Sequence, residues 1–105
     1  MRDDEMVLVG AVLEEACYSL EEVASACRVP TQWIERHVEE GLLGCLDRGA
    51  EGPLFSSHDL QRARRILAIE RDFDAVPELA ALVADMLEEM EALRTRLDRI
   101  GLGRI

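Results

Sequence analysis

The sequence has 105 residues, which allows one small domain or one domain with a helical appendage. Apolar residues make up 49% of it and only four residues are aromatic, so a compact, aliphatic core is expected and intrinsic disorder is not. The net charge is −10, from 22 acidic residues against 12 arginines and no lysine. Polyphosphate binding is therefore a poor expectation unless the arginines cluster.

The sequence carries no phosphate-binding glycine loop, no paired histidines at ligand spacing and no nucleophile motif. We therefore expect a protein that is not an enzyme and binds neither metal nor cofactor; His37 and His58 stand alone. The longest apolar run, residues 6–13, is too short to span a membrane and follows acidic residues 3–5, unlike a signal peptide. A cytoplasmic protein without a membrane partner is the expectation.

The three cysteines, Cys17, Cys27 and Cys45, are an odd number at spacings that suit neither a disulfide framework nor a zinc site. Cys27 falls among predicted helix core positions and Cys45 among predicted strand residues. Buried, reduced thiols are the interpretation favoured for all three.

The segment 6–18 could be a strand or the end of a short helix, but the chain beyond it is easier to assign. Ser19 with Glu22 three residues later forms a capping box at a helix start. Its apolar stripe is Leu20, Val23, Ala24 and Cys27. Pro30 ends this helix at residues 29–30, because proline disfavours helix in the residue before it.

A second helix is predicted over residues 31–40, with Gly41 as its left-handed cap. Its inner positions would be Trp33, Ile34 and Val38. Two short helices joined by a turn indicate a helix-turn-helix.

A hairpin is predicted next, with apolar strands at residues 42–46 and 54–55 on either side of a glycine-rich turn at 47–53. Ser56 with Asp59 then caps a third helix, which breaks at residues 72–77. The inner positions of this helix would be Leu60, Ala63, Ile66, Leu67 and Phe73.

The last helix has apolar residues at alternating spacings of three and four, which is the repeat of a coiled-coil seam. The seam begins at Val76, and its expected dimerisation residues are Leu79, Val83, Met86, Met90, Leu93, Leu97 and Ile100. Acids precede bases along this helix, which suits the helix dipole and would let antiparallel partners place acid opposite base. A homodimer is favoured over a helix that folds back on its own domain.

The order of these elements resembles the MerR family, chiefly through "SLEEVASACRVPTQWIERHVEEGLL" and "FSSHDLQRARRILAIERDF". The resemblance implies a mainly helical, all-α fold with a winged helix-turn-helix, a small β-hairpin wing and a C-terminal coiled-coil helix. Residues 1–73 would form the winged domain, with 1–17 uncertain, and residues 74–105 the dimerisation helix. DNA-binding members read roughly Arg-Tyr-Tyr-Glu-Arg before the glycine, whereas both arginine positions here are glutamates, Glu35 and Glu39. The arginine–tyrosine pair of the wing is replaced by "GPLF".

The acidic second helix, "WIERHVEEGLL", and "LAALVADMLEEMEALRTRL" more closely resemble chaperone-modulator proteins of the CbpM type. That resemblance implies that the partner is the J-domain of a CbpA- or DnaJ-like co-chaperone. It also implies that the protein inhibits the co-chaperone by covering the basic helix of the J-domain. The expected partner-binding residues are Glu21, Glu22, Glu35, Arg36, Glu39 and Glu40. The acidic surface suits a basic partner, because complementary potentials raise association rates.

The alternative is a MerR-like transcription regulator that binds DNA through the wing and the arginine-rich third helix. Arg62, Arg64, Arg65 and Arg71 give this helix a net charge of +1 over residues 57–72. Pairing of these arginines with neighbouring acids, or with the acidic coil of a second protomer, is favoured over phosphate contacts. The tail is too short to hold an effector-binding domain.

Overall fold

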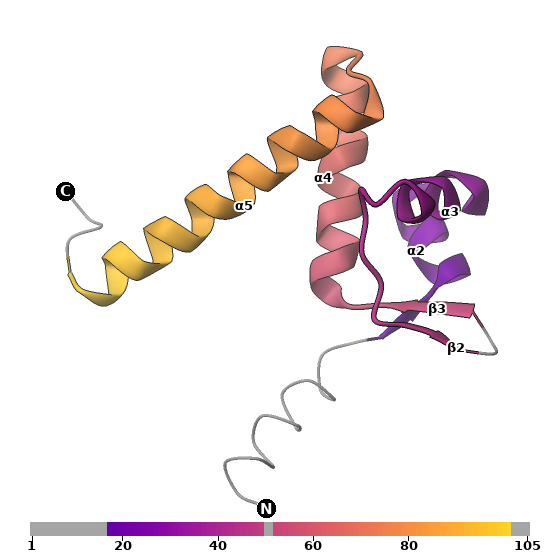
Figure 1. Ribbon diagram of the computed structural model, residues 1–105, viewed down its shortest axis with the longest axis horizontal. Helices are drawn as coiled ribbons and strands as arrows, with labels where there is room; N and C mark the ends of the chain where they lie inside the picture. The colour runs from indigo at the N-terminus through magenta and orange to yellow at the C-terminus, as the bar shows by residue number, and fades with distance from the viewer. Residues whose placement is uncertain (1–16, 50–51, 102–105) are drawn as a thin grey trace, which may run out of the picture. The chain divides into compact units, whose positions relative to one another are not determined.

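The computed structural model describes residues 17–49 and 52–101, which contain four helices and three short strands (Figure 1). The strands are β1 (Tyr18–Ser19), β2 (Asp47–Gly49) and β3 (Gly52–Phe55). The helices are α2 (Leu20–Cys27), α3 (Thr31–Glu39), α4 (Ser57–Phe73) and α5 (Pro77–Arg99). The chain divides into two compact units, which meet between Arg64 and Arg65 within α4. The predicted mainly helical fold with a hairpin is confirmed; the uncertain segment before Cys17 lies outside the described residues.

Helix α2 begins with the predicted capping box. The Ser19 hydroxyl accepts a hydrogen bond from the Glu22 backbone N–H at 3.1 Å, and Glu22 Oε1 accepts one from the Ser19 N–H at 2.8 Å. These bonds satisfy two of the backbone donors that a helix start leaves free. Arg28 closes the helix in the left-handed conformation (φ 60°), and Pro30 is the N-cap of α3. The predicted helix-turn-helix is therefore confirmed.

The first unit is built around side chains from both helices and the hairpin. Its buried residues include Val23, Ala24, Cys27, Ile34, His37, Leu43, Phe55 and Ala63. Helix α2 contacts α3 on one side and strands β1 and β3 on another. This core fixes the orientation of α3, so the outward face of that helix is set by packing and not by the helix alone.

The first strand of the hairpin lies later in the sequence than predicted, and the second begins earlier. The strands occupy residues 47–49 and 52–55, with Asp47 opposite Leu54 and Gly49 opposite Gly52, so the predicted strand at 42–46 is wrong. Leu42 and Leu43 instead complete the end of α3, where both of their backbone N–H groups donate to the His37 carbonyl. The assignment failed because apolar residues that follow a helix cap were interpreted as a strand.

The sheet has the order β1-β3-β2, with both pairings antiparallel. Strand β1 is only two residues long, and Tyr18 lies opposite Phe55. Phe55 is fully buried whereas the preceding Leu54 is exposed, because alternate residues of a strand point to opposite faces. The sheet thus anchors the start of α2 to the wing.

Helix α4 begins with a second capping interaction, also as predicted. The Ser56 hydroxyl accepts from the Asp59 N–H at 3.0 Å, and Asp59 Oδ2 accepts from the Ser56 N–H at 3.0 Å. Leu67 is buried and Leu60 is half-buried, but Phe73 is 75% exposed, so its predicted inner position is wrong. Phe73 is the last residue of α4, where the helix ends before Asp74 at positive φ (51°).

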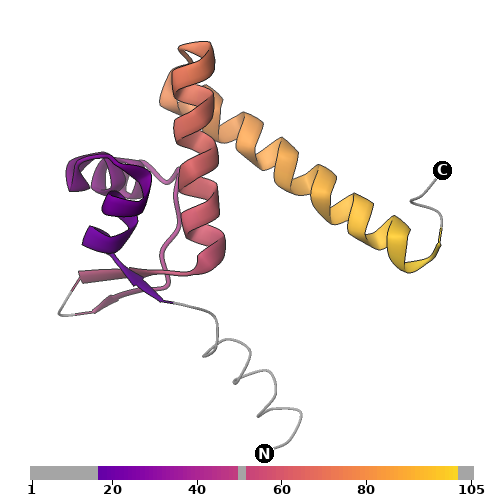
Figure 2. The same ribbon diagram turned by 180° about the vertical axis from the view of Figure 1, so that it is seen from behind.

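Helix α5 is one uninterrupted helix, seen from behind in Figure 2, and begins with Pro77. Ala80, Ala81 and Ala84 are buried on one of its faces. The predicted seam falls on another face, since residues advance by about 100° each around a helix. All seam residues except the half-buried Val83 are exposed, by 43–66% from Val76 to Ile100. Within the described chain, the seam is therefore largely uncovered.

Burial raises the pKa of the Cys27 thiol above its ordinary value of 9.0, an effect that the nearby Arg64 charge partly offsets. The prediction of buried thiols holds for Cys27, but Cys45 is half-buried in the segment before β2, not in a strand, and Cys17 is exposed.

We expect iodoacetamide at pH 8 to modify Cys27 at least about tenfold more slowly than Cys17, because the thiolate is the reactive form and Cys27 is buried. Folding raises the pKa of Cys27, so the neutral thiol contributes to the stability of the folded protein. This contribution is fully present below pH 9.0 and is lost as the pH rises through the raised pKa of the folded state. Mass spectrometry of the digested protein measures the rates. Equal rates for the two thiols under native conditions would contradict the expectation.

Candidate partner-binding surface

The outward face of the helix-turn-helix is acidic. Residues 20–40 contain five glutamates and two arginines. The six predicted partner-binding residues are all exposed: Glu21, Glu22, Glu35, Arg36, Glu39 and Glu40. We call this set the acidic surface. The structure therefore leaves every one of these side chains open to a partner, although Glu22 is also held by its capping interaction.

The pattern of α3 explains which of its side chains point outward. Ile34 and His37 are buried, so the residues following each of them, Glu35, Arg36 and Glu39, lie on the solvent side. Glu35 and Glu39 are four residues apart and are therefore neighbours on one face of the helix. Two like charges at this spacing destabilise an isolated helix by about 0.2–0.5 kcal/mol.

The position of the acids along α3 is also unfavourable to the helix. Glu39 is the last helical residue and Glu40 is the C-cap, where the helix dipole favours positive charge. The first turn of α3, where acids would be favourable, has none. The end of α3 is therefore net acidic where the helix dipole favours positive charge, although Arg36 stands at attractive spacings of three and four residues from Glu39 and Glu40.

His37 is a residue whose role the sequence interpretation missed. It is 98% buried (2% exposed), its ring stacks on Trp33 at 3.7 Å between centroids, and its Nδ1 donates to the Trp33 carbonyl oxygen at 2.7 Å. The spacing of three residues from Ile34 and four from Trp33 could have indicated that His37 lies on the inner face of the helix. The histidine therefore packs the inner side of α3, and is not part of the acidic surface.

Arg62 and Arg65 of α4 form polar contacts with other parts of the chain. Arg62 Nε donates to the Leu42 carbonyl oxygen at 2.9 Å, which fixes the segment after α3. Arg65 forms an ion pair with Glu91, with 2.7 Å between Nη2 and Oε2. The predicted pairing with a neighbouring acid is thus confirmed for Arg65, whereas Arg62 binds a backbone carbonyl. Arg64 and Arg71 are exposed.

The wing adds no basic side chain in β3, whose residues are Gly52, Pro53, Leu54 and Phe55. Phe55 is buried and Leu54 is exposed. Within residues 17–49 and 52–101, no group of three or more histidine, cysteine, aspartate or glutamate residues could hold a metal ion. None of the helices described is both long and apolar enough to cross a membrane.

A helix-turn-helix, a hairpin and a following long helix, in this order, define a winged helix-turn-helix protein. The family model described as "MerR HTH family regulatory protein" matches residues 18–101, so the chain belongs to the MerR family of helix-turn-helix regulatory proteins. No curated protein and no solved structure matches the sequence significantly.

Proposed function

We propose that this MerR-family protein is a non-enzymatic modulator, acting as an inhibitor, of a DnaJ- or CbpA-like co-chaperone, and that it binds the J-domain through the acidic surface. The observation that carries the proposal is the acidic end of α3, where Glu35, Glu39 and Glu40 are exposed against the preferences of the helix itself. A basic helix on the partner would neutralise this charge. The resemblance to CbpM-type modulators supplies the identity of that partner.

The charge of this surface also separates the proposal from a DNA-binding function. A protein that binds DNA neutralises phosphates with lysine and arginine, and this provides much of its affinity. Residues 20–40 have more than twice as many acids as bases, and Arg62 is used within the chain. A major groove would therefore repel α3, while a cationic protein surface would attract it.

We expect the double variant Glu35→Arg/Glu39→Arg to weaken J-domain binding by at least about tenfold, since about 1.4 kcal/mol corresponds to a factor of ten. The measurement is a titration with the purified J-domain of a CbpA-like protein at low and moderate salt. Binding to wild-type protein should weaken as salt rises, because salt screens exposed charges. A DNA-binding protein would respond in the opposite way, with the two added arginines tightening its contact with promoter DNA in a gel shift.

The matched control is Glu78→Arg/Asp98→Arg, which makes the same change in net charge at two exposed positions of α5. It should bind the J-domain like wild-type protein. No J-domain binding by wild-type protein, or equal loss in both double variants, would contradict the proposed surface.

A further inference from the structure

The acidic end of α3 is closed by a defined backbone motif. Gly41 adopts positive φ (77°), and the Leu42 N–H donates to the His37 carbonyl oxygen at 2.9 Å. A left-handed residue followed by a hydrogen bond of this kind is the Schellman motif, which satisfies carbonyl groups that the end of a helix leaves free. Because Glu39 and Glu40 directly precede Gly41, the conformation of this motif helps to determine where the two carboxylates lie.

A side chain of α4 holds this motif from outside α3. Arg62 Nε donates to the Leu42 carbonyl oxygen at 2.9 Å, and the Arg62 side chain is half-buried. Hydrogen bonds with a charged donor are roughly twice as strong as those between neutral groups. The same contact places a positive charge beside the C-terminal end of α3, where the helix dipole favours one. Arg62 therefore stabilises the end of α3 both by a hydrogen bond and by its charge.

We infer that Arg62 is a positioning residue for the acidic surface, which acts through Leu42 and not by contact with the partner. It holds the end of α3 in the conformation that presents Glu39 and Glu40. Acids at a helix C-terminus oppose the helix dipole, so the end of an unsupported α3 would fray. A surface that is ordered before the partner arrives avoids the cost of ordering it on binding. This inference rests on the proposed binding of a J-domain by the acidic surface.

The charge of Arg62 makes the inference testable, because position and net charge predict opposite results. Replacement of one arginine by glutamine changes the net charge of the chain by one unit, from −10 to −11. If the acidic surface acted through overall charge alone, Arg62→Gln would bind a basic partner at least as tightly as the wild-type protein. If Arg62 positions the surface, the variant binds less tightly although it is more negative.

We expect Arg62→Gln to weaken binding to the purified J-domain of a CbpA-like protein by at least about fivefold, because the partner must then order the end of α3 itself. Arg64→Gln is the matched control, since it makes the same change in charge at an exposed position two residues along α4. It should bind at least as tightly as wild-type protein. Arg62→Lys, which keeps the charge and a hydrogen-bond donor, should recover part of the lost affinity. Equal affinities of Arg62→Gln and Arg64→Gln would overturn the inference.

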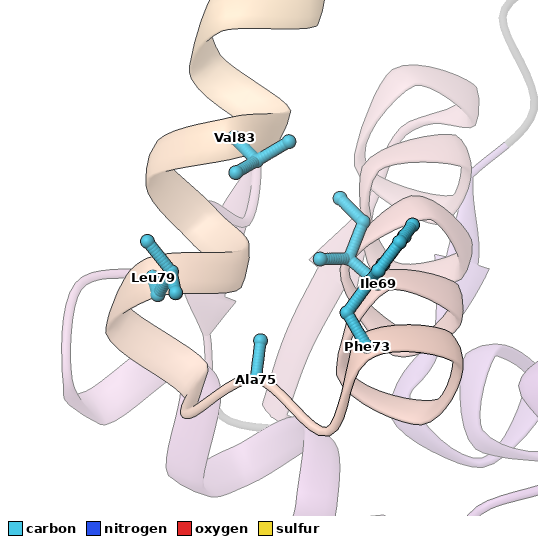
Figure 3. A pocket seen from close by; sticks show the side chains of 5 residues that line it. All are labelled: Ile69, Phe73, Ala75, Leu79 and Val83. Atoms are coloured by element: carbon cyan, nitrogen blue, oxygen red, sulfur yellow. The ribbon is translucent and has the colours of Figure 1, made fainter.

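The other end of α4 provides a control that separates loss of position from loss of stability. An apolar cavity of about 290 Å³ lies there, and the described residues that line it all belong to the second unit (Figure 3): Ile69, Phe73, Ala75, Leu79 and Val83. Ile69→Ala removes packing at this cavity, so it should lower the midpoint of urea denaturation. It should leave the affinity for the J-domain at the wild-type value. If Ile69→Ala and Arg62→Gln lowered both quantities equally, the effect of Arg62 would be one of stability alone, and the inference would be overturned.

Hydrogen exchange of the free protein distinguishes failure of this inference from failure of the proposed function. The N–H groups of Leu42 and Leu43 both donate to the His37 carbonyl oxygen. We expect Arg62→Gln to speed their exchange by at least about tenfold, because the end of α3 then opens more often. The N–H of Ala24, in the buried part of α2, should keep its wild-type rate. Unchanged exchange at Leu42 and Leu43 would overturn the positioning role. Faster exchange, with no J-domain binding by wild-type protein, would overturn the proposed partner and leave the hold of Arg62 on α3 supported.

Discussion

The variant Phe55→Ala is expected to lose about 3–5 kcal/mol of unfolding free energy, a typical cost for truncating a fully buried phenylalanine. Phe55 has no exposed surface and lies in β3, the central strand of the sheet, opposite Tyr18. Domains of this size have only about 5–15 kcal/mol of stability in total. The variant should therefore lose a large fraction of the total stability of the protein.

Urea denaturation followed by circular dichroism measures this loss. Leu54→Ala is the matched control, because Leu54 is the preceding residue of the same strand but is exposed, and it should cost less than about 1 kcal/mol. Equal destabilisation by the two variants would show that β3 does not present Phe55 alone to the core.

The variant Met90→Glu is expected to convert the homodimer predicted from the sequence into a monomer. Met90 is 52% exposed in the single chain, so the substitution leaves the fold of that chain intact. Met90 belongs to the predicted seam, so each dimer paired through that seam would bury two added carboxylates. Burial of an unpaired charge costs several kcal/mol, enough to dissociate a short coiled coil.

Light scattering or sedimentation measures the mass. Thr95→Glu adds the same charge at an exposed position outside the seam and should leave the mass at that of a dimer. If the Met90→Glu and Thr95→Glu variants both keep the wild-type mass, α5 does not pair through this seam.

Local signals in the sequence predicted most of the helices. Both capping boxes, at Ser19 and Ser56, form as expected, because a hydroxyl and a carboxylate three residues apart satisfy each other's backbone donors without help from distant residues. The predicted cap at Gly41 adopts positive φ (77°), as glycine readily does. These features depend on few neighbours, so the sequence alone indicates them.

The features that the sequence did not predict depend on tertiary packing. The position of the hairpin could not be predicted from apolar residues, because Leu42 and Leu43 bond to the end of α3 and not across a sheet. The residue type of His37 did not indicate the core, although its spacing from Trp33 and Ile34 places it on the inner side of α3. The acidic surface was predictable as a set of exposed residues, whereas its chemical partner rests on resemblance.

The crowding of negative charge at the end of α3 has one consequence for how the free and bound protein respond to ionic strength. Added salt weakens repulsion among Glu35, Glu39 and Glu40, and so stabilises the free helix. The same salt weakens attraction between these residues and a cationic partner. The free surface and the proposed complex would thus respond to salt in opposite directions, because a cationic partner would neutralise the charges that repel one another in the free helix.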